Sequence, residues 1–499
     1  MKGNKSYGWR GLGIALVALL ALPAIAQAQS WVALTHPAPF NPNDMEQLTD
    51  GRILVQQYSP SSGVDEYWTL VPDSTGSYVN GTWTQVCSLP PGYSPLYHTS
   101  QVRSDGSVVV AGGEYNFLSA DWTNLAAIYD PVSNCWTSLA APTFFANIGD
   151  AQSVMLPNGT MMMANSVANQ DAILSAPPIL PPTWTSTGTG KQDNNNDEEG
   201  WNLLPDGSVL TVDTPTAFGN DGERWVNGVW SSDGMSPVNL INRGEGQEEI
   251  GPALLLPTNG TVFYIGGAGP NAIYTPIANS VGTWAAGPTF PNQGGQLGVA
   301  DGPAAVLPDG DVLVGASPGI FSTPTVFFDF NPTTGSLTGV TAPPSANTEA
   351  CYNGRMLVLP TGQIMYTNLL NSNSGAAYIY TDPGVSKHAW APVVKKFPAT
   401  VTHGSVNNVI KGTQFNGLTS GCSYGDDAQC STAFPLVRIT VGAVVTYCRT
   451  HNHSTMGIAT GTEHVSTEFD APATLPIGAG TLEVVANGIS SKPVNITVN

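Results

Sequence analysis

The stretch ADGPAAVLPDGDVLVG, residues 300–315, decides the fold of this chain. The apolar run AAVL leads into Pro308-Asp309-Gly310, and the apolar run VLV follows after one residue. Asp-Gly between two apolar runs is a strong signal for a β-hairpin, and a two-residue hairpin turn of this kind needs positive φ at both central residues. We therefore predict an antiparallel hairpin with Asp309-Gly310 at its tip.

The same hairpin pattern occurs seven times, and consecutive turn glycines are 48 to 55 residues apart. A period near 50 that contains only strand patterns is typical of a kelch-type β-propeller, which has four strands in each blade. The seven turns are Thr49-Asp50-Gly51, Ser104-Asp105-Gly106, Pro157-Asn158-Gly159, Pro205-Asp206-Gly207, Thr258-Asn259-Gly260, Pro308-Asp309-Gly310 and Pro360-Thr361-Gly362. The repeat predicts an all-β, seven-bladed propeller over residues 29–388.

One more strand pattern, Trp31–Leu34, stands before the first hairpin. We expect it to supply the fourth strand of the last blade and so to join the two ends of the propeller. The alternative is a sandwich of seven unrelated hairpins, which does not account for the nearly equal spacing.

The N-terminus carries the pattern of a secretory signal. Three cations precede an apolar run over residues 11–25, and Ala26-Gln27-Ala28 then offers a small-x-small cleavage site. We expect residues 1–28 to be a signal peptide and the mature chain to be secreted or periplasmic, the alternative being a retained anchor. No later apolar run approaches the length of a membrane span, so we expect no membrane partner after cleavage.

The chain is strongly acidic, with 36 Asp and Glu against 16 Lys and Arg and a net charge of −20. Loss of three cations with the signal peptide would bring the net charge to −23. Such a charge argues against nucleic acid as a partner. A cation, a neutral glycan or a basic ligand is easier to accommodate. We expect a small-molecule or glycan ligand and a monomer.

Six cysteines in an exported chain predict disulfides, although spacing alone cannot give their pairing. Cys422 and Cys430 bracket a short loop and are the favoured pair. A bond between Cys351 and Cys448 would join the two domains and is a second hypothesis.

The period of 50 stops near Ala391-Pro392, and shorter strand patterns follow to the end of the chain. We expect residues 389–499 to form an immunoglobulin-like sandwich. Its long connection, residues 449–463, carries His451 and His453. The alternative for these histidines is a polar loop that orders itself through side-chain to backbone hydrogen bonds.

Residues nine positions before each turn glycine should lie at the mouth of the central channel, because the first strand of each hairpin lines it. These residues are Pro42, Tyr97, Asp150, Glu198, Ile250, Asp301 and Asn353. They predict a ligand site that includes Asp150, Glu198, Asp301 and Asn353, the alternative being a set of solvated loop ends.

A polar insertion at residues 181–200 ends in several acids. Asp193, Asp197, Glu198 and Glu199 are candidate calcium ligands, because hard cations bind clustered oxygens. The spacing is not that of an EF-hand, and a solvated loop is the favoured interpretation.

The propeller repeat, the order of the domains and the stretch YCRTHNHSTM, residues 447–456, resemble the galactose oxidase and glyoxal oxidase family. The resemblance implies a copper ion held by two tyrosines and two histidines, with one tyrosine forming a catalytic radical. On this pattern Tyr97 is the radical tyrosine and Tyr352 is the second tyrosine. The resemblance also implies that the long connection of the C-terminal domain brings a histidine, His451 or His453, into the channel. Tyr115 stands where the family has a stacking tryptophan.

Two positions depart from the family pattern: Asn353 replaces the other histidine, and Pro42 replaces the cysteine that cross-links to the radical tyrosine. Imidazole is the ligand that best suits copper in such a site. Our first hypothesis is therefore a propeller that binds a ligand, plausibly a glycan, at the channel mouth without radical-copper chemistry. The alternative is a copper oxidase of alcohols or aldehydes with an altered ligand set. A third hypothesis is a glycan hydrolase or lyase that uses Asp150, Glu198 and Asp301.

Overall fold

The computed structural model describes residues 1, 3 and 29–499, except 61–62, 216–218, 279, 370–374 and 429. The predicted signal peptide therefore lies almost entirely outside the described residues. The described chain consists of short strands and three 3₁₀-helices of three residues each. This confirms the predicted all-β class. Within the described chain, no helix is long and apolar enough to span a bilayer.

The seven predicted turns are tight hairpin turns, but their geometry differs from the expected one. Gly310 has φ of 96°, and the other six turn glycines also have positive φ, whereas Asp309 and the six residues equivalent to it do not. The Gly310 N–H donates to the Leu307 carbonyl oxygen. This is a type I turn followed by a glycine in the left-handed region, so only the glycine needs positive φ.

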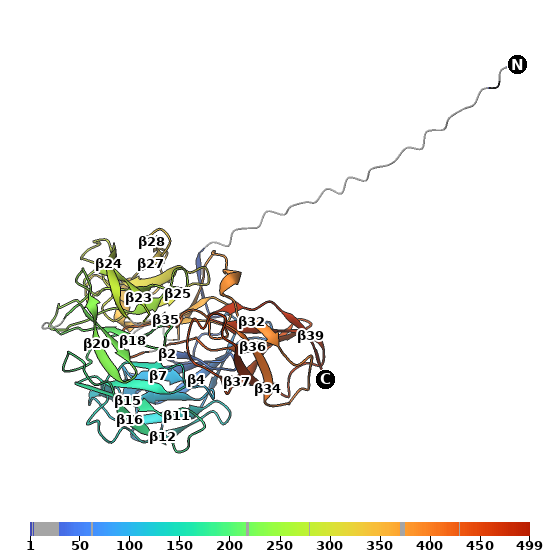
Figure 1. Ribbon diagram of the computed structural model, residues 1–499, viewed down its shortest axis with the longest axis horizontal. Helices are drawn as coiled ribbons and strands as arrows, with labels where there is room; N and C mark the ends of the chain where they lie inside the picture. The colour runs from blue at the N-terminus through green and yellow to red at the C-terminus, as the bar shows by residue number, and fades with distance from the viewer. Residues whose placement is uncertain are drawn as a thin grey trace.

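Seven sheets share one antiparallel order, in which each strand pairs with the next (Figure 1). The last of them is completed by β1, Ser30–Ala33, which pairs with β31 so that Trp31 lies opposite Tyr380. Strands β2 to β31 and the two helices among them lie as follows: β2 Asn41–Gln47, β3 Ile53–Tyr58, β4 Tyr67–Val71, β5 Thr82–Gln85; β7 Thr99–Val102, β8 Val108–Ala111, β11 Ala126–Asp130, β12 Cys135–Leu139; β13 Ser153–Met155, β14 Met161–Asn165, β15 Ala168–Leu174, β16 Trp184–Thr187; β17 Asn202–Leu203, β18 Val209–Val212, β19 Asp221–Val226, β20 Val229–Met235; β21 Ala253–Leu255, β22 Val262–Tyr264, β23 Pro270–Ile277, β24 Ser280–Thr289; β25 Ala304–Val306, β26 Val312–Ala316, β27 Val326–Asn331, β28 Ser336–Val340; β29 Gly354–Val358, β30 Ile364–Asn368, β31 Tyr378–Thr381; and, outside these sheets, β6 Pro95–Leu96, β9 Tyr115–Asn116, β10 Ser119–Ala120, η1 Ala346–Thr348 and η2 Cys351–Asn353.

The first strands of these sheets form a closed ring. β2, β7, β13, β17 and β21 contact one another in chain order, β25 contacts β29, and β29 contacts β2. Between β21 and β25 the ring is bridged by β35, Cys422–Ser423, which pairs with β25. This closed arrangement is that of a β-propeller, with the first strand of each sheet innermost.

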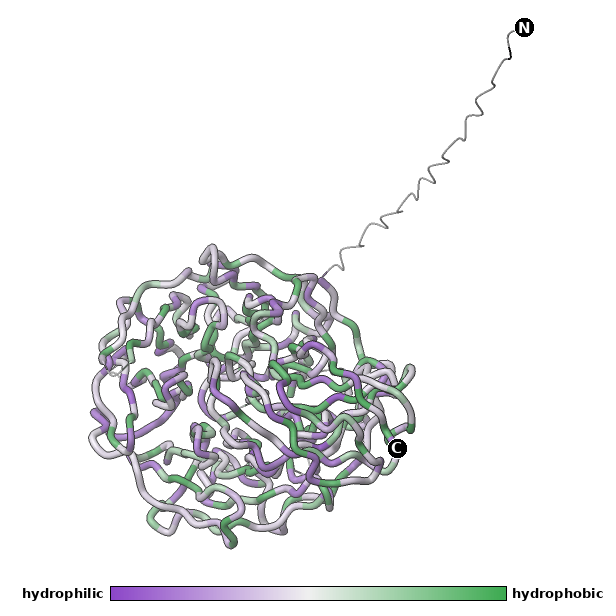
Figure 2. Tube along the Cα trace, turned by 45° about the vertical axis from the view of Figure 1, so that its right-hand side comes forward, coloured by the Kyte–Doolittle hydropathy of each residue, from purple (hydrophilic) through white to green (hydrophobic). Residues whose placement is uncertain are grey.

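The burial of the second strand of each hairpin explains why the repeat appears in the sequence as apolar runs. All four residues of β8 are buried, with at most 1% of the surface of any of them exposed. Strands that are covered on both faces read as continuous apolar segments rather than as alternating ones. In Figure 2 the green, apolar stretches lie mainly within the body of the molecule, while many outer loops are white or purple.

The C-terminal part forms a sheet of its own at one side of the propeller (Figure 1). Its order is β32-β34-β38-β37-β36-β39-β41-β33, with β40 on β39, and its core includes Val437, Cys448 and Leu482. Whether this unit is immunoglobulin-like stays a prediction. Helix η3 is His388–Trp390, and the strands are β32 Val393–Lys396, β33 Thr400–Val401, β34 Asn408–Thr413, β36 Leu436–Val441, β37 Val444–His451, β38 Val465–Asp470, β39 Gly478–Ala486, β40 Ile489–Ser490 and β41 Val494–Val498.

The cysteine pairing differs from both predictions. Cys87 and Cys135 form a disulfide, and Cys351, Cys422, Cys430 and Cys448 are buried thiols. Cys448 lies in the core of the C-terminal sheet, whereas Cys351 lies at the propeller channel with its thiol near the carbonyl oxygens of Ala300 and Asp301, so they do not meet. The Cys422 thiol donates to the Cys430 carbonyl oxygen at 2.7 Å, and no bond joins the two sulfurs.

This pairing can be tested by peptide mapping of the unreduced protein. We expect one cross-linked peptide pair, which contains Cys87 and Cys135, and four thiols that react with an alkylating reagent only after unfolding, because burial blocks access to them. A Cys87→Ser variant should leave Cys135 alkylated as well. A cross-linked pair that contains Cys422 and Cys430 would contradict the assignment.

Candidate functional site

A cavity of about 220 Å³ lies where the first strands of several sheets begin. Four of the seven positions predicted to face the channel mouth line it: Tyr97, Asp150, Glu198 and Asp301. The full lining is Tyr97, Glu114, Tyr115, Asp150, Glu198, Gln247, Glu249, Asp301, Phe321, Tyr352, Tyr424, Asp426 and Asp427. Residues that are hundreds of positions apart in sequence therefore meet in one site, seven of them carboxylic acids.

The backbone at three equivalent positions of the ring is unusual. Tyr97, Glu198 and Asp301 have φ of 52°, 57° and 41°, each just before the first strand of its sheet. A residue with a Cβ in the left-handed region costs roughly 1 to 2 kcal/mol. The fold accepts this cost at the positions whose side chains line the cavity.

The floor of the cavity comes from the C-terminal part of the chain. After β35 pairs with β25, the segment turns at Tyr424, whose hydroxyl donates to the Tyr352 carbonyl oxygen at 2.5 Å. Asp426 and Asp427 follow and line the cavity. A Cβ on Gly425 would lie 2.7 Å from Asp301 Oδ1, so a larger residue there would displace the Asp301 carboxyl group.

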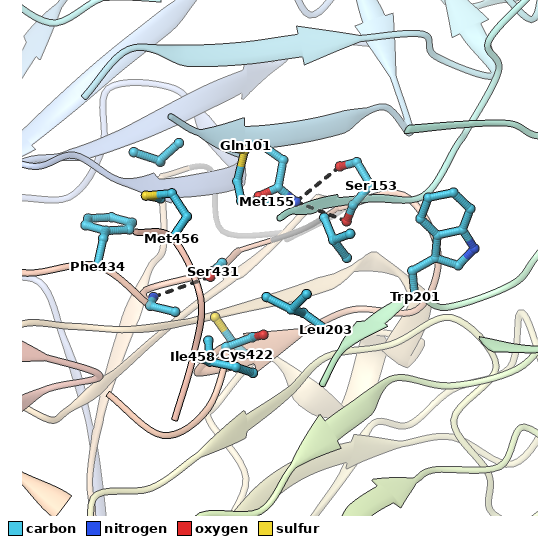
Figure 3. Close-up of a pocket in the computed structure, with 14 residues that line it drawn as sticks. Gln101, Ser153, Met155, Trp201, Leu203, Cys422, Ser431, Phe434, Met456 and Ile458 are labelled. Atoms are coloured by element: carbon cyan, nitrogen blue, oxygen red, sulfur yellow. Dashed lines mark hydrogen bonds between the residues drawn. The ribbon is translucent and has the colours of Figure 1, made fainter. Parts of the chain in front are cut away.

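The rest of this inserted segment, described at residues 418–428 and 430–434, packs inside the ring. Figure 3 shows Cys422, Ser431 and Phe434 facing Gln101 and Ser153 from the first strands β7 and β13. Gln101 Nε2 donates to both the Ser153 carbonyl and Oγ at 3.1 Å. The domain boundary near residue 388 stays a prediction, and a segment from beyond that boundary returns to the propeller channel.

Arg355 lies next to the cavity, but its charge is already balanced. Its Nε donates to Asp44 Oδ1 at 2.5 Å, and the guanidinium lies 3.6 Å from the centre of the Tyr424 ring. It also lies 5.9 Å from the Tyr97 ring. None of the residues that line the cavity is a lysine, arginine or histidine.

Burial and mutual repulsion act on the cavity acids together. Burial, with Asp427 and Glu249 as the nearest charges, raises the pKa of Glu114 to about 7. The pKa values of Asp150 and Asp426 are raised well above the usual range, first by burial and then by neighbouring carboxylates. The same holds for Glu198 and Asp301. Near neutral pH the cavity therefore contains both neutral carboxyl groups, which can donate, and carboxylates, which can only accept.

The two predicted histidines lie elsewhere. His453 N–H donates to the Ser104 carbonyl oxygen, at the turn that ends the first hairpin strand β7, whereas Tyr97 lies just before that strand begins. His451 Nε2 is 3.0 Å from Asp470 Oδ1, and His453 Nδ1 is 2.8 Å from Thr467 Oγ1. The long connection thus meets the opposite end of the strands, and the histidines are separated from Tyr97 and Tyr352.

This arrangement does not fit a copper ion. The predicted ligands Tyr97 and Tyr352 line the cavity together. Apart from the side-chain amide of Gln247, however, the polar side chains of the lining offer a metal ion only carboxyl and hydroxyl oxygens. Copper sites of the predicted kind need imidazole. Asn353 also lies outside the lining, as a residue of η2 that is 3% exposed.

The predicted calcium cluster of residues 193–199 is divided in the structure, and it is not a solvated loop. Glu198 belongs to the cavity, whereas Asp193 and Glu199 are buried behind it, at most 1% exposed. There Lys191 Nζ lies 2.9 Å from Glu199, 2.9 Å from Asp213 and 3.1 Å from Glu223. This lysine supplies the positive charge that a metal ion would supply.

Replacement of Lys191 tests this interpretation. Lys191→Met should lower the free energy of unfolding by about 3 to 5 kcal/mol, because it leaves three buried carboxylates without a counter-charge. Denaturant unfolding at neutral pH measures the loss. The exposed Lys492→Met serves as control, and a loss below about 1 kcal/mol for Lys191→Met would contradict the role.

Sequence reasoning missed Glu114, Gln247, Phe321, Tyr424, Asp426 and Asp427. The chain has two long connections in its C-terminal part, and the one with histidines was expected in the channel. The other connection carries Asp426-Asp427 in a chain where only 10% of residues are charged, which was the available signal.

Comparison with known proteins supports the fold alone. Neither a protein-family model nor a curated protein sequence matches this chain. A solved fungal alcohol oxidase of the AA5 family, in complex with copper, superposes with a TM-score of 0.55 at 16% identity over 95% of this chain and 100% of that chain. Virginiamycin B lyase from Staphylococcus aureus matches with a TM-score of 0.46 at 9% identity over 71% of this chain and 99% of that chain. The chain therefore has the overall build of the copper oxidase, and the site must be judged on its own residues.

Proposed function

We propose that the chain is an exported binding protein that takes a polyhydroxylated ligand, a glycan, at the mouth of its propeller channel. The observation that carries the proposal is the lining of the cavity: seven carboxyl groups and aromatic rings, with no imidazole. Carboxylates accept hydrogen bonds from hydroxyl groups, and protonated carboxyls donate them. Membership of the galactose oxidase-like family is part of the same proposal, and it rests on the shared fold.

The aromatic rings of the cavity form two edge-to-face pairs. The ring centres of Tyr97 and Tyr115 lie 6.1 Å apart, and those of Phe321 and Tyr352 lie 5.2 Å apart. Phe321 is 47% exposed, and Tyr115 is partly exposed. Such rings present apolar faces on which the C–H face of a sugar can lie, while the acids reach its hydroxyls.

Copper-dependent oxidation of alcohols or aldehydes is the alternative function. Two observations favour it: the build shared with a copper alcohol oxidase, and the presence of both predicted tyrosines, Tyr97 and Tyr352, in one cavity. The positions of His451 and His453 oppose it, because they bond to Asp470 and Thr467 away from the cavity.

Hydrolysis or elimination by the cavity acids is a third candidate. Asp150 and Glu198 belong to one group of side chains whose oxygens approach within 4.8 Å, and Asp301 joins Glu198 in another. Two carboxyls this close are nearer to the pair of about 5 to 5.5 Å in which one acts as general acid and the other as nucleophile than to a pair that activates water. Release of free sugar during the binding test would favour this candidate over simple binding.

The test is a screen of neutral and basic glycans on the mature protein, followed by calorimetry of the best ligand. Tyr115→Ala should weaken binding about tenfold, because the loss of one stacked ring costs about 1.5 kcal/mol. Phe144→Ala removes an exposed aromatic ring outside the cavity and should leave the affinity unchanged.

Two results would contradict the proposal. One is the absence of any glycan ligand whose affinity depends on Tyr115. The other is about one copper per chain after copper loading, lost in Tyr97→Phe, together with peroxide production from an alcohol or aldehyde, which would establish the oxidase instead.

A further inference from the structure

We infer that the cavity holds a hard divalent cation of the size of Ca²⁺, bound by carboxylates around Glu198. Two groups of acids meet at this residue: Glu198 with Asp150 and Asp426, and Glu198 with Glu249 and Asp301. Within each group the potential ligand oxygens all lie within 4.8 Å of one another. This inference does not depend on the glycan proposal, because it concerns the metal ion alone.

The donor set fits calcium better than magnesium. Calcium takes about six to eight oxygen ligands in a flexible geometry, and five carboxylates meet around Glu198 when Glu198 itself is counted. Magnesium demands a nearly ideal octahedron, keeps several waters and is usually bound through one or two carboxylates. Carboxylates also satisfy the preference of calcium for hard oxygen donors, and they do not suit copper.

Unpartnered oxygens inside the cavity give a second and independent indication. Asp150 is 7% exposed and Glu249 is 5% exposed, and both line the cavity. Asp150 Oδ1 and Glu249 Oε2 are buried and have no hydrogen-bond partner. A buried oxygen without a partner costs about 1 to 3 kcal/mol, and more for a charged group, so a ligand that pairs with several of them at once is favoured.

The contacts between acids point the same way. Glu249 lies within hydrogen-bonding reach of both Glu198 and Asp301. Carboxylates come this close when a proton or a cation lies between them. The other buried acid cluster of the chain contains Lys191, whereas no lysine, arginine or histidine lines this cavity. A bound dication would balance the charge of the cavity carboxylates, as Lys191 balances the charge of the other cluster.

The fold holds these acids on rigid elements. Glu198 lies shortly before β17 and Asp301 shortly before β25, the first strands of two sheets between which the sheet of β21 lies, and Asp426 belongs to the inserted segment. Tyr424 fixes that tip, since its carbonyl oxygen accepts from the Gly302 N–H at 3.0 Å. The ligands therefore come from the propeller and the C-terminal part together, so the ion would join the two.

The test is calorimetry of the full mature chain, stripped with a chelator and titrated with CaCl₂ alone. We expect saturable binding that is at least tenfold weaker in Glu198→Gln and in Asp426→Asn. Terbium, an ion of similar size, should show luminescence excited through the cavity tyrosines Tyr97, Tyr115, Tyr352 and Tyr424, and both variants should reduce it. Glu349→Gln is the matched control, because Glu349 is 2% exposed but lies outside the cavity.

Thermal unfolding separates a ligand role from a merely structural one. Calcium should raise the midpoint of the wild type, because it binds the folded chain. Without calcium, Glu198→Gln should be at least as stable as the wild type, because it removes repulsion, and it should lose the calcium-dependent rise. Absence of saturable calcium binding would overturn the inference. So would binding that both variants leave unchanged, or tighter binding of Mg²⁺ than of Ca²⁺.

Discussion

The closed ring of first strands is the constraint on which the site depends. β1 pairs with β31 along four residues, and β29 contacts β2, so the two ends of the propeller are fastened to each other. Closure removes the free sheet edges that an open array would expose. It also fixes the residues just before the strands around one mouth, which brings Asp150, Glu198 and Asp301 within reach of one another.

The described residues include two kinds of buried acid cluster, one with a lysine counter-charge and one without. Behind the cavity, Lys191 contacts three carboxylates at 2.9 to 3.1 Å and every partner is fully buried. In the cavity, a larger set of acids faces an open volume of about 220 Å³ with no cation among the lining residues. The cavity carboxyl groups have no cation beside them in the lining, which costs stability. The left-handed backbone at Tyr97, Glu198 and Asp301 costs stability as well. Destabilising features of this kind are retained at sites where the binding of a ligand offsets their free-energy cost.

The sequence alone was sufficient to predict the repeated hairpins. It was insufficient to predict contacts between residues that are far apart in the chain. The turn glycines predicted the hairpins, and the ring of positions nine residues earlier correctly placed Tyr97, Asp150, Glu198 and Asp301 at one mouth. The turn type was wrong, because a type I turn with a following glycine needs only one residue of positive φ. The burial of Lys191 and Glu199 could not be predicted, because the partners of Lys191 include Asp213 and Glu223, which belong to a later part of the chain.

The residues at the floor of the cavity show why two proteins of the same fold need not catalyse the same reaction. The family resemblance implied that the connection 449–463 brings a histidine into the channel. Met456 and Ile458 of that connection do pack against the first strands, but His451 and His453 stay at the other end of the strands. The cavity is lined instead by residues of the inserted segment that follows β35. The inserted tip carries Tyr424, Asp426 and Asp427 in place of an imidazole. The donors at the centre of the ring are therefore hard oxygens, which favour a hard cation or the hydroxyls of a ligand over copper. One inserted segment, held by Tyr424 to Tyr352 and Gly302, decides the chemistry of the mouth while the surrounding propeller keeps the same architecture.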